Sequence, residues 1–209
     1  MDMIPVVYDL HQCPDCGLIS SDLKPDPSLY DKSYLRKYER YEETEAGKDL
    51  NGMRVGLVRS HTECSAVLDF GCGSGAFVRH CMKHGIEAVG FDINPNSPYC
   101  DVANLFNGHS VVTLWDSLEH LEDPKTVVNG LGGEYLFVST PSTDDFDGGD
   151  LTGWHHYYPE EHIHYYNDES LSRLFEECGY EVTFRSYGES RYRRSGSGKN
   201  IITMGGVNG

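Results

Sequence analysis

Short apolar runs alternate with helical stretches along most of the chain. Apolar runs predict β-strands near residues 66–70, 88–92, 110–115, 133–139, 180–187 and 200–206. Helical spacing predicts helices near 76–84, 124–130 and 168–178, and two more before the first strand, from about 30 to 45 and from 48 to 59. Such alternation implies an α/β fold with a mostly parallel sheet, helices on both faces and ligands bound at the carboxyl ends of the strands.

A turn rich in glycine follows the first predicted strand, with Gly71, Gly73 and Gly75 at alternate positions. Because glycine has no Cβ, the backbone can turn sharply there and a ligand can lie against main-chain N–H groups. Asp92 ends the next apolar run, where a carboxylate can bind both hydroxyls of a ribose. These features predict a cradle for a nucleotide-type cofactor.

Two kinds of cofactor fit such a cradle. The spacing Gly71-x-Gly73-x-x-Ala76 also satisfies the dinucleotide fingerprint, in which a helix N-terminus holds a pyrophosphate. However, Asp69 lies two residues before the first glycine, and its negative charge would repel a pyrophosphate. The same charge suits a cofactor that carries an ammonium and a sulfonium group, so a positively charged cofactor is favoured.

The pattern Asp-x-Gly-x-Gly-x-Gly over residues 69–75, followed by Gly-Phe-Asp at 90–92, resembles class I S-adenosylmethionine-dependent methyltransferases. Residues 111–124 resemble the fourth strand and following loop of that family, which often reads D-x-L-E-H-L-x-D-P, and 135–141 and 169–182 resemble its fifth strand, last helix and sixth strand. The resemblance covers roughly residues 30–207 and implies a Rossmann-like fold with S-adenosylmethionine as cofactor.

The resemblance also implies which residues bind the cofactor. Asp69 and the glycines should shape the methionine end of the pocket, Asp92 should hold the ribose, and Asp116 with Ser117 should flank the transferred methyl group. The full expected set is Asp69, Gly71, Cys72, Gly73, Gly75, Asp92, Ile93, Asp101, Trp115, Asp116 and Ser117.

One region departs from the family pattern. Only 18 residues separate Asp92 from Val111, where the usual fold has a helix, a third strand and a connection. We expect a shortened third-strand region, with Tyr99 to Ala103 as its remnant and Asp101 near the adenine. A truncated edge exposes the cofactor pocket or leaves it to be covered by a partner chain, so a homodimer is one expected arrangement.

Four histidines and five aromatic residues lie within residues 154–166, before the last helix. The pair Glu161-His162 resembles a glutamate-histidine pair in relatives that act on nucleotide-linked sugars, where the histidine accepts a substrate proton. We therefore predict Glu161 and His162 as catalytic residues, with His164 as the alternative base. The pair could instead anchor the loop through hydrogen bonds, and His120 could either line the substrate channel or cap a helix.

A metal site within this loop is a further alternative, built from His155, His156, His162 and His164. No spacing of cysteines or carboxylates supports it, so no metal is predicted. The pair Cys13 and Cys16 forms half of a zinc knuckle in an N-terminal segment, residues 1–29, that precedes a methyltransferase domain over 30–209. His11 could add a third ligand, but a vestigial knuckle without metal is favoured.

Charge narrows the choice of acceptor. The chain has 17 basic and 33 acidic residues, a net charge of −16, which repels polyanions at long range. A small polar acceptor is therefore favoured, such as a sugar, a nucleotide or another metabolite. Modification of nucleic acid or another macromolecule ranks second, through a basic loop containing Arg191, Arg193, Arg194 and Lys199, and a non-enzymatic cofactor sensor or scaffold ranks third.

The sequence also bears on location. No apolar run approaches the roughly 18 residues of a membrane span, and no signal peptide is visible. The 7 cysteines are scattered and odd in number, as in a protein with reduced thiols. We expect a cytoplasmic protein without a membrane partner.

Overall fold

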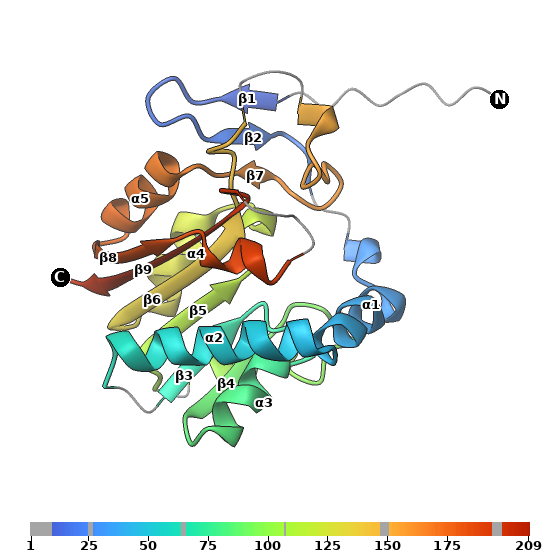
Figure 1. Ribbon diagram of the computed structural model, residues 1–209, viewed down its shortest axis with the longest axis vertical. Coiled ribbons are helices and arrows are strands. Elements are labelled where there is room, and N and C mark those ends of the chain that lie inside the picture. The colour runs from blue at the N-terminus through green and yellow to red at the C-terminus, as the bar shows by residue number, and fades with distance from the viewer. Residues whose placement is uncertain (1–9, 25–26, 64–65, 107, 147–150, 194–197) are drawn as a thin grey trace.

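The computed structural model describes residues 10–24, 27–63, 66–106, 108–146, 151–193 and 198–209. A six-stranded sheet with strand order β4-β3-β5-β6-β9-β8 forms the centre of the molecule (Figure 1). Its strands are β3 (Ala66–Phe70), β4 (Glu87–Phe91), β5 (Val111–Trp115), β6 (Tyr135–Pro141), β8 (Tyr180–Ser186) and β9 (Ile201–Asn208). Strands β4, β3, β5 and β6 are parallel, whereas β9 runs antiparallel to both β6 and β8. The predicted mostly parallel sheet is confirmed.

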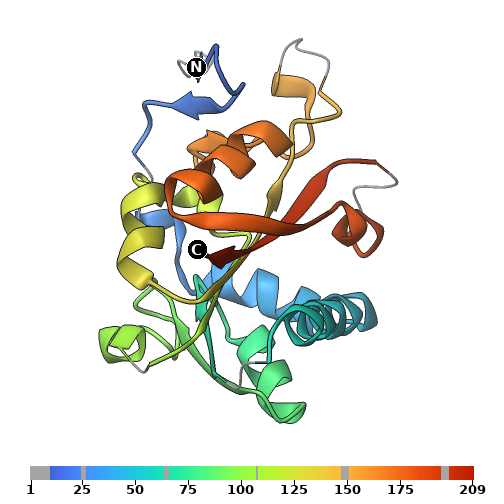
Figure 2. The same cartoon turned by 90° about the vertical axis from the view of Figure 1, so that its left-hand side faces the viewer.

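Helices cover both faces of this sheet, and Figure 2 shows α2 and α4 on opposite sides of it. The α-helices are α1 (Lys32–Glu42), α2 (Glu45–His61), α3 (Ala76–Lys83), α4 (Pro124–Leu131) and α5 (Asp168–Glu177). The short 3-10 helices are η1 (Pro27–Leu29), η2 (Val102–Phe106), η3 (Leu118–His120), η4 (Leu151–Gly153) and η5 (Gly188–Arg191). All five predicted α-helices are therefore present.

Alternation of side chains along β5 and β6 divides the core into two layers. Val112 and Leu136 pack with α4 and α5, while their neighbours Val111 and Phe137 pack with α2 and α3. Successive side chains of a strand point to opposite faces, so a parallel strand covered on both sides has mostly apolar residues. This explains why β5, in which every residue is buried, reads as a nearly continuous apolar run.

Local signals fix the helix ends. The carboxylate of Asp31 accepts hydrogen bonds from the N–H groups of Ser33 and Tyr34 and so caps α1. Asn167 and Ser170 form a reciprocal capping box at the start of α5. These caps satisfy backbone donors that the first helical turn leaves without partners.

The region between β4 and β5 is shortened, as the sequence predicts. Its described part contains the 3-10 helix η2 but no strand, so β4 is an edge strand of the sheet. The predicted remnant at Tyr99 to Ala103 is not a strand. Instead, the backbone carbonyl of Tyr99 accepts a hydrogen bond from the N–H of Asp92, and its ring packs against Gly75.

A second, smaller sheet was not predicted. It contains β1 (Leu10–Gln12), β2 (Ile19–Ser21) and β7 (His164–Tyr165), and it lies at the end of the molecule seen at the top of Figure 1. Because β2 pairs with β7, the N-terminal segment shares a sheet with the loop before α5 and is not separate from the domain that follows it. No helix in the described residues is long and apolar enough to cross a membrane.

The half zinc knuckle forms the turn between β1 and β2. Cys13 donates its N–H to the carbonyl of Leu18 and accepts one from Gly17, at 2.8 and 2.9 Å. Both thiols are free and partly exposed. In the described part of the chain, no third metal-binding group gathers with Cys13 and Cys16.

Candidate active site

A cavity of about 330 Å³ opens beyond the carboxyl ends of β3, β4 and β5, where a parallel sheet is expected to bind ligands. On the sheet side it is lined by Asp69, Gly71, Cys72, Gly73, Asp92, Trp115, Asp116 and Ser117. Three other segments also line it, namely α1 with the residues before it, η3 and the loop before β7, through Tyr30, Tyr34, Tyr38, Tyr41, Glu119, His120, His156, Tyr158, Glu161 and His162. The cavity therefore joins most of the predicted cofactor residues to the predicted catalytic pair.

Two of the three glycines in the turn, Gly71 and Gly75, have no room for a larger side chain. Gly71 has a φ of 77°, and a Cβ on it would lie 2.5 Å from the Cβ of Ser117. Gly75 has a φ of 79°, and its Cβ would lie 2.0 Å from the ring of Tyr99. Contacts this short do not occur between carbon atoms, so both positions require glycine. The turn thus places its bare backbone at the cavity.

Asp92 connects the end of β4 to the glycine turn. Its carboxylate accepts hydrogen bonds from the N–H of Gly73 at 2.7 Å and from the N–H of Asn94 at 2.8 Å. Each carboxylate oxygen has a further lone pair, and the residue lines the cavity, so Asp92 can also accept hydrogen bonds from a ribose. Its predicted role fits this position.

Three residues of the predicted cofactor set do not line the cavity. One is Gly75, the N-cap residue of α3, and the other two belong to the connection after β4. Ile93 is 85% exposed, and Asp101 is exposed and accepts the N–H of Ala103 in a local turn. Neither lines the cavity, although Asn94, which follows Ile93, does. The structure therefore gives no support to a cofactor contact from Ile93 or Asp101.

Asp69 is buried at the cavity floor. The hydroxyl of Thr113, its neighbour on β5, donates a hydrogen bond to it across 2.8 Å. Burial raises the pKa of Asp69 to about 7, and the hydrogen bond from Thr113 opposes this rise. A positively charged ligand group beside Asp69 would favour its ionised form.

Asp116 belongs to a network of charged residues at the cavity wall. Its φ of 53° is the only positive value among the described residues other than glycine. Oδ2 of Asp116 accepts hydrogen bonds from Arg54 at 3.0 Å and from Arg193 at 2.5 Å. Both arginines also bind the fully buried carboxylate of Glu189. The two guanidinium groups hold the pKa of Asp116 below its usual range, although burial alone would raise it.

This network was not predicted. The sequence suggests that Arg193 belongs to a basic loop, but its side chain points inward to Asp116, while Arg191 is exposed and Arg194 lies outside the described residues. Arg54, from α2, also lies 4.7 Å from the ring centroid of Trp115. Arg54 and Glu189 are 135 residues apart, and no local pattern signals such a contact.

His120 and His162 both line the cavity and meet edge to face, with ring centroids 4.9 Å apart. Nδ1 of His162 lies 3.1 Å from the carbonyl oxygen of His156, and Nδ1 of His120 lies 2.8 Å from that of Glu161. Burial lowers the pKa of His162 to about 3, with a further contribution from His120. Both imidazoles are therefore neutral near pH 7, and His120 lines the cavity.

Glu161 lines the cavity beside His162, and its carboxylate lies 3.4 Å from the hydroxyl of Tyr34. His164 does not line the cavity, since it belongs to β7 and its Nδ1 lies 3.0 Å from the hydroxyl of Ser20. The four histidines of the loop do not form a common cluster among the described residues. The structure thus brings the Glu161-His162 pair to the cavity and leaves the alternative base outside it.

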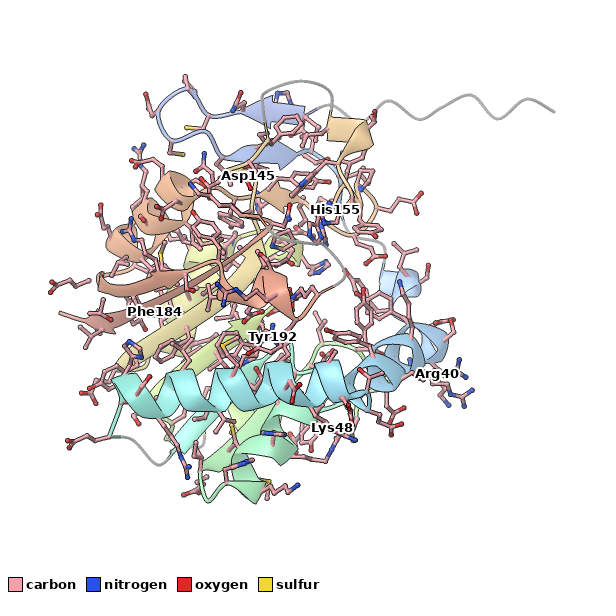
Figure 3. All side chains as sticks on the ribbon, viewed as in Figure 1. Arg40, Lys48, Asp145, His155, Phe184 and Tyr192 are labelled. Carbon is pink, nitrogen blue, oxygen red and sulfur yellow. The ribbon has the colours of Figure 1, made fainter. Side chains whose placement is uncertain are left out.

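A row of tyrosines was missed as part of the site. Tyr30, Tyr34, Tyr38 and Tyr41 lie on or just before α1 and all line the cavity, whereas Arg40 points away from the molecule (Figure 3). Their spacing of three and four residues places them on one face of the helix. That spacing was visible in the sequence and could have identified the wall.

Comparisons with known proteins agree with this geometry. A family profile described as a methyltransferase domain matches residues 33–183, more than half of the chain. Magnesium protoporphyrin IX methyltransferase from Synechocystis, with S-adenosylhomocysteine bound, aligns with a TM-score of 0.65 and 13% identity, covering 88% of this chain and 98% of that chain. A comparison with curated proteins finds no match.

A second solved structure is 1,6-didemethyltoxoflavin-N1-methyltransferase from Burkholderia thailandensis, with its acceptor and S-adenosylhomocysteine bound. It aligns with a TM-score of 0.60 and 11% identity, covering 96% of this chain and 99% of that chain. At this identity the likeness shows the fold. The glycine turn and the carboxylates of Asp69 and Asp92 fit the cofactor of these proteins, so the chain belongs to the methyltransferase domain family and is a class I S-adenosylmethionine-dependent methyltransferase.

Proposed function

We propose that the protein transfers the methyl group of S-adenosylmethionine to a small polar acceptor, such as a sugar, a nucleotide or another metabolite. One observation carries the proposal: a single cavity of about 330 Å³ extends from the glycine turn and Asp92 to a wall of tyrosines and histidines. Cavities of this size suit small molecules, and aromatic side chains exclude water while offering flat faces.

The reaction requires little covalent chemistry from the protein. An oxygen, nitrogen or carbon atom of the acceptor attacks the methyl carbon in line with the sulfonium, the new bond forms as the carbon–sulfur bond breaks, and S-adenosylhomocysteine leaves. Positioning supplies much of the rate, and a proton acceptor is needed where the attacking atom carries a proton.

His162 is the proposed proton acceptor. A carbonyl oxygen can only accept, so the contact between Nδ1 of His162 and the carbonyl of His156 places the proton on Nδ1. Nε2 then carries a lone pair. The low pKa of His162, about 3, makes that nitrogen a weak base and favours an acceptor that is acidic or activated in another way. Glu161 contributes by holding His120 through its backbone carbonyl.

Charge supports a small acceptor over a nucleic acid. The net charge of −16 opposes a polyanion, and Arg193 is engaged by Asp116 and Glu189. Among the relatives, the toxoflavin enzyme is named for methylation of a small heterocycle and the Synechocystis enzyme for a porphyrin. Both acceptors are small molecules, which supports the same class here.

Transfer of an isotope-labelled methyl group into a cell extract tests the proposal. After reaction, the extract is fractionated into small molecules, nucleic acid and protein. We expect label in the small-molecule fraction, a large loss with His162→Ala, and no loss with His155→Ala, a neighbouring histidine that does not line the cavity. Label in nucleic acid or protein would overturn the acceptor class, and bound cofactor without any labelled product would favour a sensor or scaffold.

A further inference from the structure

We propose that Glu119, His120 and His162 bind a divalent metal cation at the acceptor end of the cavity. Each side chain offers one ligand atom, and these three atoms all lie within 4.8 Å of one another. Glu119 and His120 come from η3, directly after β5, and His162 comes from the loop before β7. All three residues line the cavity.

Hydrogen bonds prepare both imidazoles for a cation. The Nδ1 atoms of His120 and His162 each lie close to a backbone carbonyl, at 2.8 and 3.1 Å, so each Nδ1 carries the proton. Both Nε2 atoms are left with a lone pair. Metal-binding histidines show this arrangement, in which a carbonyl or carboxylate accepts the second N–H and fixes the ring. Tyr30 adds a further contact, with its hydroxyl 3.1 Å from Nδ1 of His120.

Glu119 lacks a cation of its own among the described ion pairs. It is 1% exposed, and the hydroxyl of Thr140 donates a hydrogen bond to Oε2 across 3.0 Å. By contrast, the buried carboxylate of Glu189 is paired with Arg54 and Arg193. Burial of a carboxylate without a positive partner is costly, and a bound cation would supply that partner.

Two imidazole nitrogens and one carboxylate suit a transition-metal ion such as Zn²⁺ or Mn²⁺, and three protein ligands leave coordination positions for other groups. Since the ligands line the cavity, those positions face the acceptor. This inference rests on the proposed methyl transfer and narrows its acceptor to molecules with a hydroxyl that can bind a metal, above all those with a second oxygen beside it.

The cation would also replace His162 as the means of activating the acceptor. A bound cation lowers the pKa of a coordinated hydroxyl, which then loses its proton to solvent. The oxygen attacks the methyl carbon, an O–C bond forms and the S–C bond breaks. The products are the methylated acceptor, S-adenosylhomocysteine and one proton. Nε2 of His162 cannot bind a metal and accept a proton at the same time. Removal of the metal therefore distinguishes the role of His162 as a ligand from its role as a base.

Binding of Mn²⁺ to the full chain tests the site. The protein is first freed of metal by a chelator, and binding is then measured by calorimetry and by the electron paramagnetic resonance of free Mn²⁺. Mn²⁺ is chosen because it prefers oxygen and nitrogen ligands and so avoids the thiols of Cys13 and Cys16. We expect one ion per chain, and an affinity at least tenfold lower in Glu119→Gln and in His162→Ala.

His84→Ala is the matched control. His80 and His84 stack on the surface at α3, four residues apart, and could hold a probe ion without any functional meaning. Removal of His84 should leave the Mn²⁺ affinity unchanged. Equal affinity in the wild type, Glu119→Gln and His162→Ala would overturn the proposal, as would no binding of Mn²⁺ or Zn²⁺.

Calorimetry with S-adenosylhomocysteine separates this proposal from the proposed function. Both site variants should bind it as the wild type does, because the side-chain hydrogen bonds of Glu119 and His162 are with Thr140 and the carbonyl of His156 and not with the glycine turn. Methyl transfer that persists at full rate after chelation would support the proposed function and contradict a role for the metal in it. Metal binding without methyl transfer to any small molecule would support the metal site and contradict the proposed class of acceptor.

Discussion

Oδ2 of Asp92 accepts a hydrogen bond from the backbone N–H of Gly73 across 2.7 Å. The carboxylate at the end of β4 therefore holds the glycine turn at the end of β3, besides facing the cavity. One side chain thus shapes the cradle and offers acceptors to a ligand.

Asp92→Ala should weaken binding of S-adenosylhomocysteine. Loss of one charge-assisted pair of hydrogen bonds costs roughly 1.5–3 kcal/mol, or about 10- to 150-fold in affinity. Isothermal calorimetry measures this, with Asp101→Ala as the control. Asp101 is exposed and outside the cavity, so its replacement should leave the affinity unchanged, and a comparable loss there would restore the sequence-based assignment.

Gly71→Ala should destabilise the protein and impair cofactor binding, because the new Cβ would lie 2.5 Å from that of Ser117 at a φ of 77°. Gly56→Ala is the control: nothing lies within 4 Å of a Cβ built there, and Gly56 lies within α2. Alanine in a helix should stabilise by about 0.5–1 kcal/mol. Urea unfolding compares the two, and equal stabilities would contradict the tight turn.

Arg54→Met should lower the free energy of unfolding by about 3–5 kcal/mol, because it removes a partner from the buried carboxylate of Glu189. Lys125→Ala breaks an ion pair with Glu177 in which both side chains are exposed, and it should cost at most about 1 kcal/mol. Denaturant titration of both variants measures the contrast. Similar losses would mean that Arg193 alone compensates Glu189.

Cofactor affinity should rise as the pH increases through about 7. Burial raises the pKa of Asp69 to about 7, so the carboxyl is largely protonated below that pH and charged above it. The positive cofactor favours the charged form. By linkage, the same raised pKa makes folding without ligand less favourable as the pH rises from about 4 to 7. Asp69→Asn should abolish the contribution of Asp69 to the pH dependence of cofactor affinity and of stability. Calorimetry and unfolding experiments between pH 5 and 8 measure the two. If both pH dependences persist in the variant, another group causes them.

The central sheet could be predicted because its signals are local. Apolar runs marked all six strands, and the spacing of Gly71, Gly73 and Gly75 located the cavity. The small sheet could not be predicted, since strands of two or three residues are too short for a periodicity to emerge. Its pairing between Ser20 and His164 joins residues 144 positions apart.

Site residues that belong to one sequence motif were predicted. Site residues that come together from distant segments of the chain were missed. Asp92 and His162 each belong to a short recognisable pattern and reach the cavity. The contact of Arg54 with Glu189 depends on how α2 packs beside η5, which the sequence does not encode locally. Ile93 and Asp101 were assigned to the cofactor from the family resemblance, but neither lines the cavity, whereas Asn94 from the same connection lines it and was not predicted.

Helix α1 contributes a wall to the cavity without contributing a buried residue to the core. Substitutions on its tyrosine face can therefore change which molecules the enzyme accepts while the sheet and the cofactor cradle keep their stability. Evolution and protein engineering usually have to trade new specificity against folding. Because α1 lines the cavity but adds no buried residue to the core, we expect that a new acceptor specificity could be introduced there at small cost to stability.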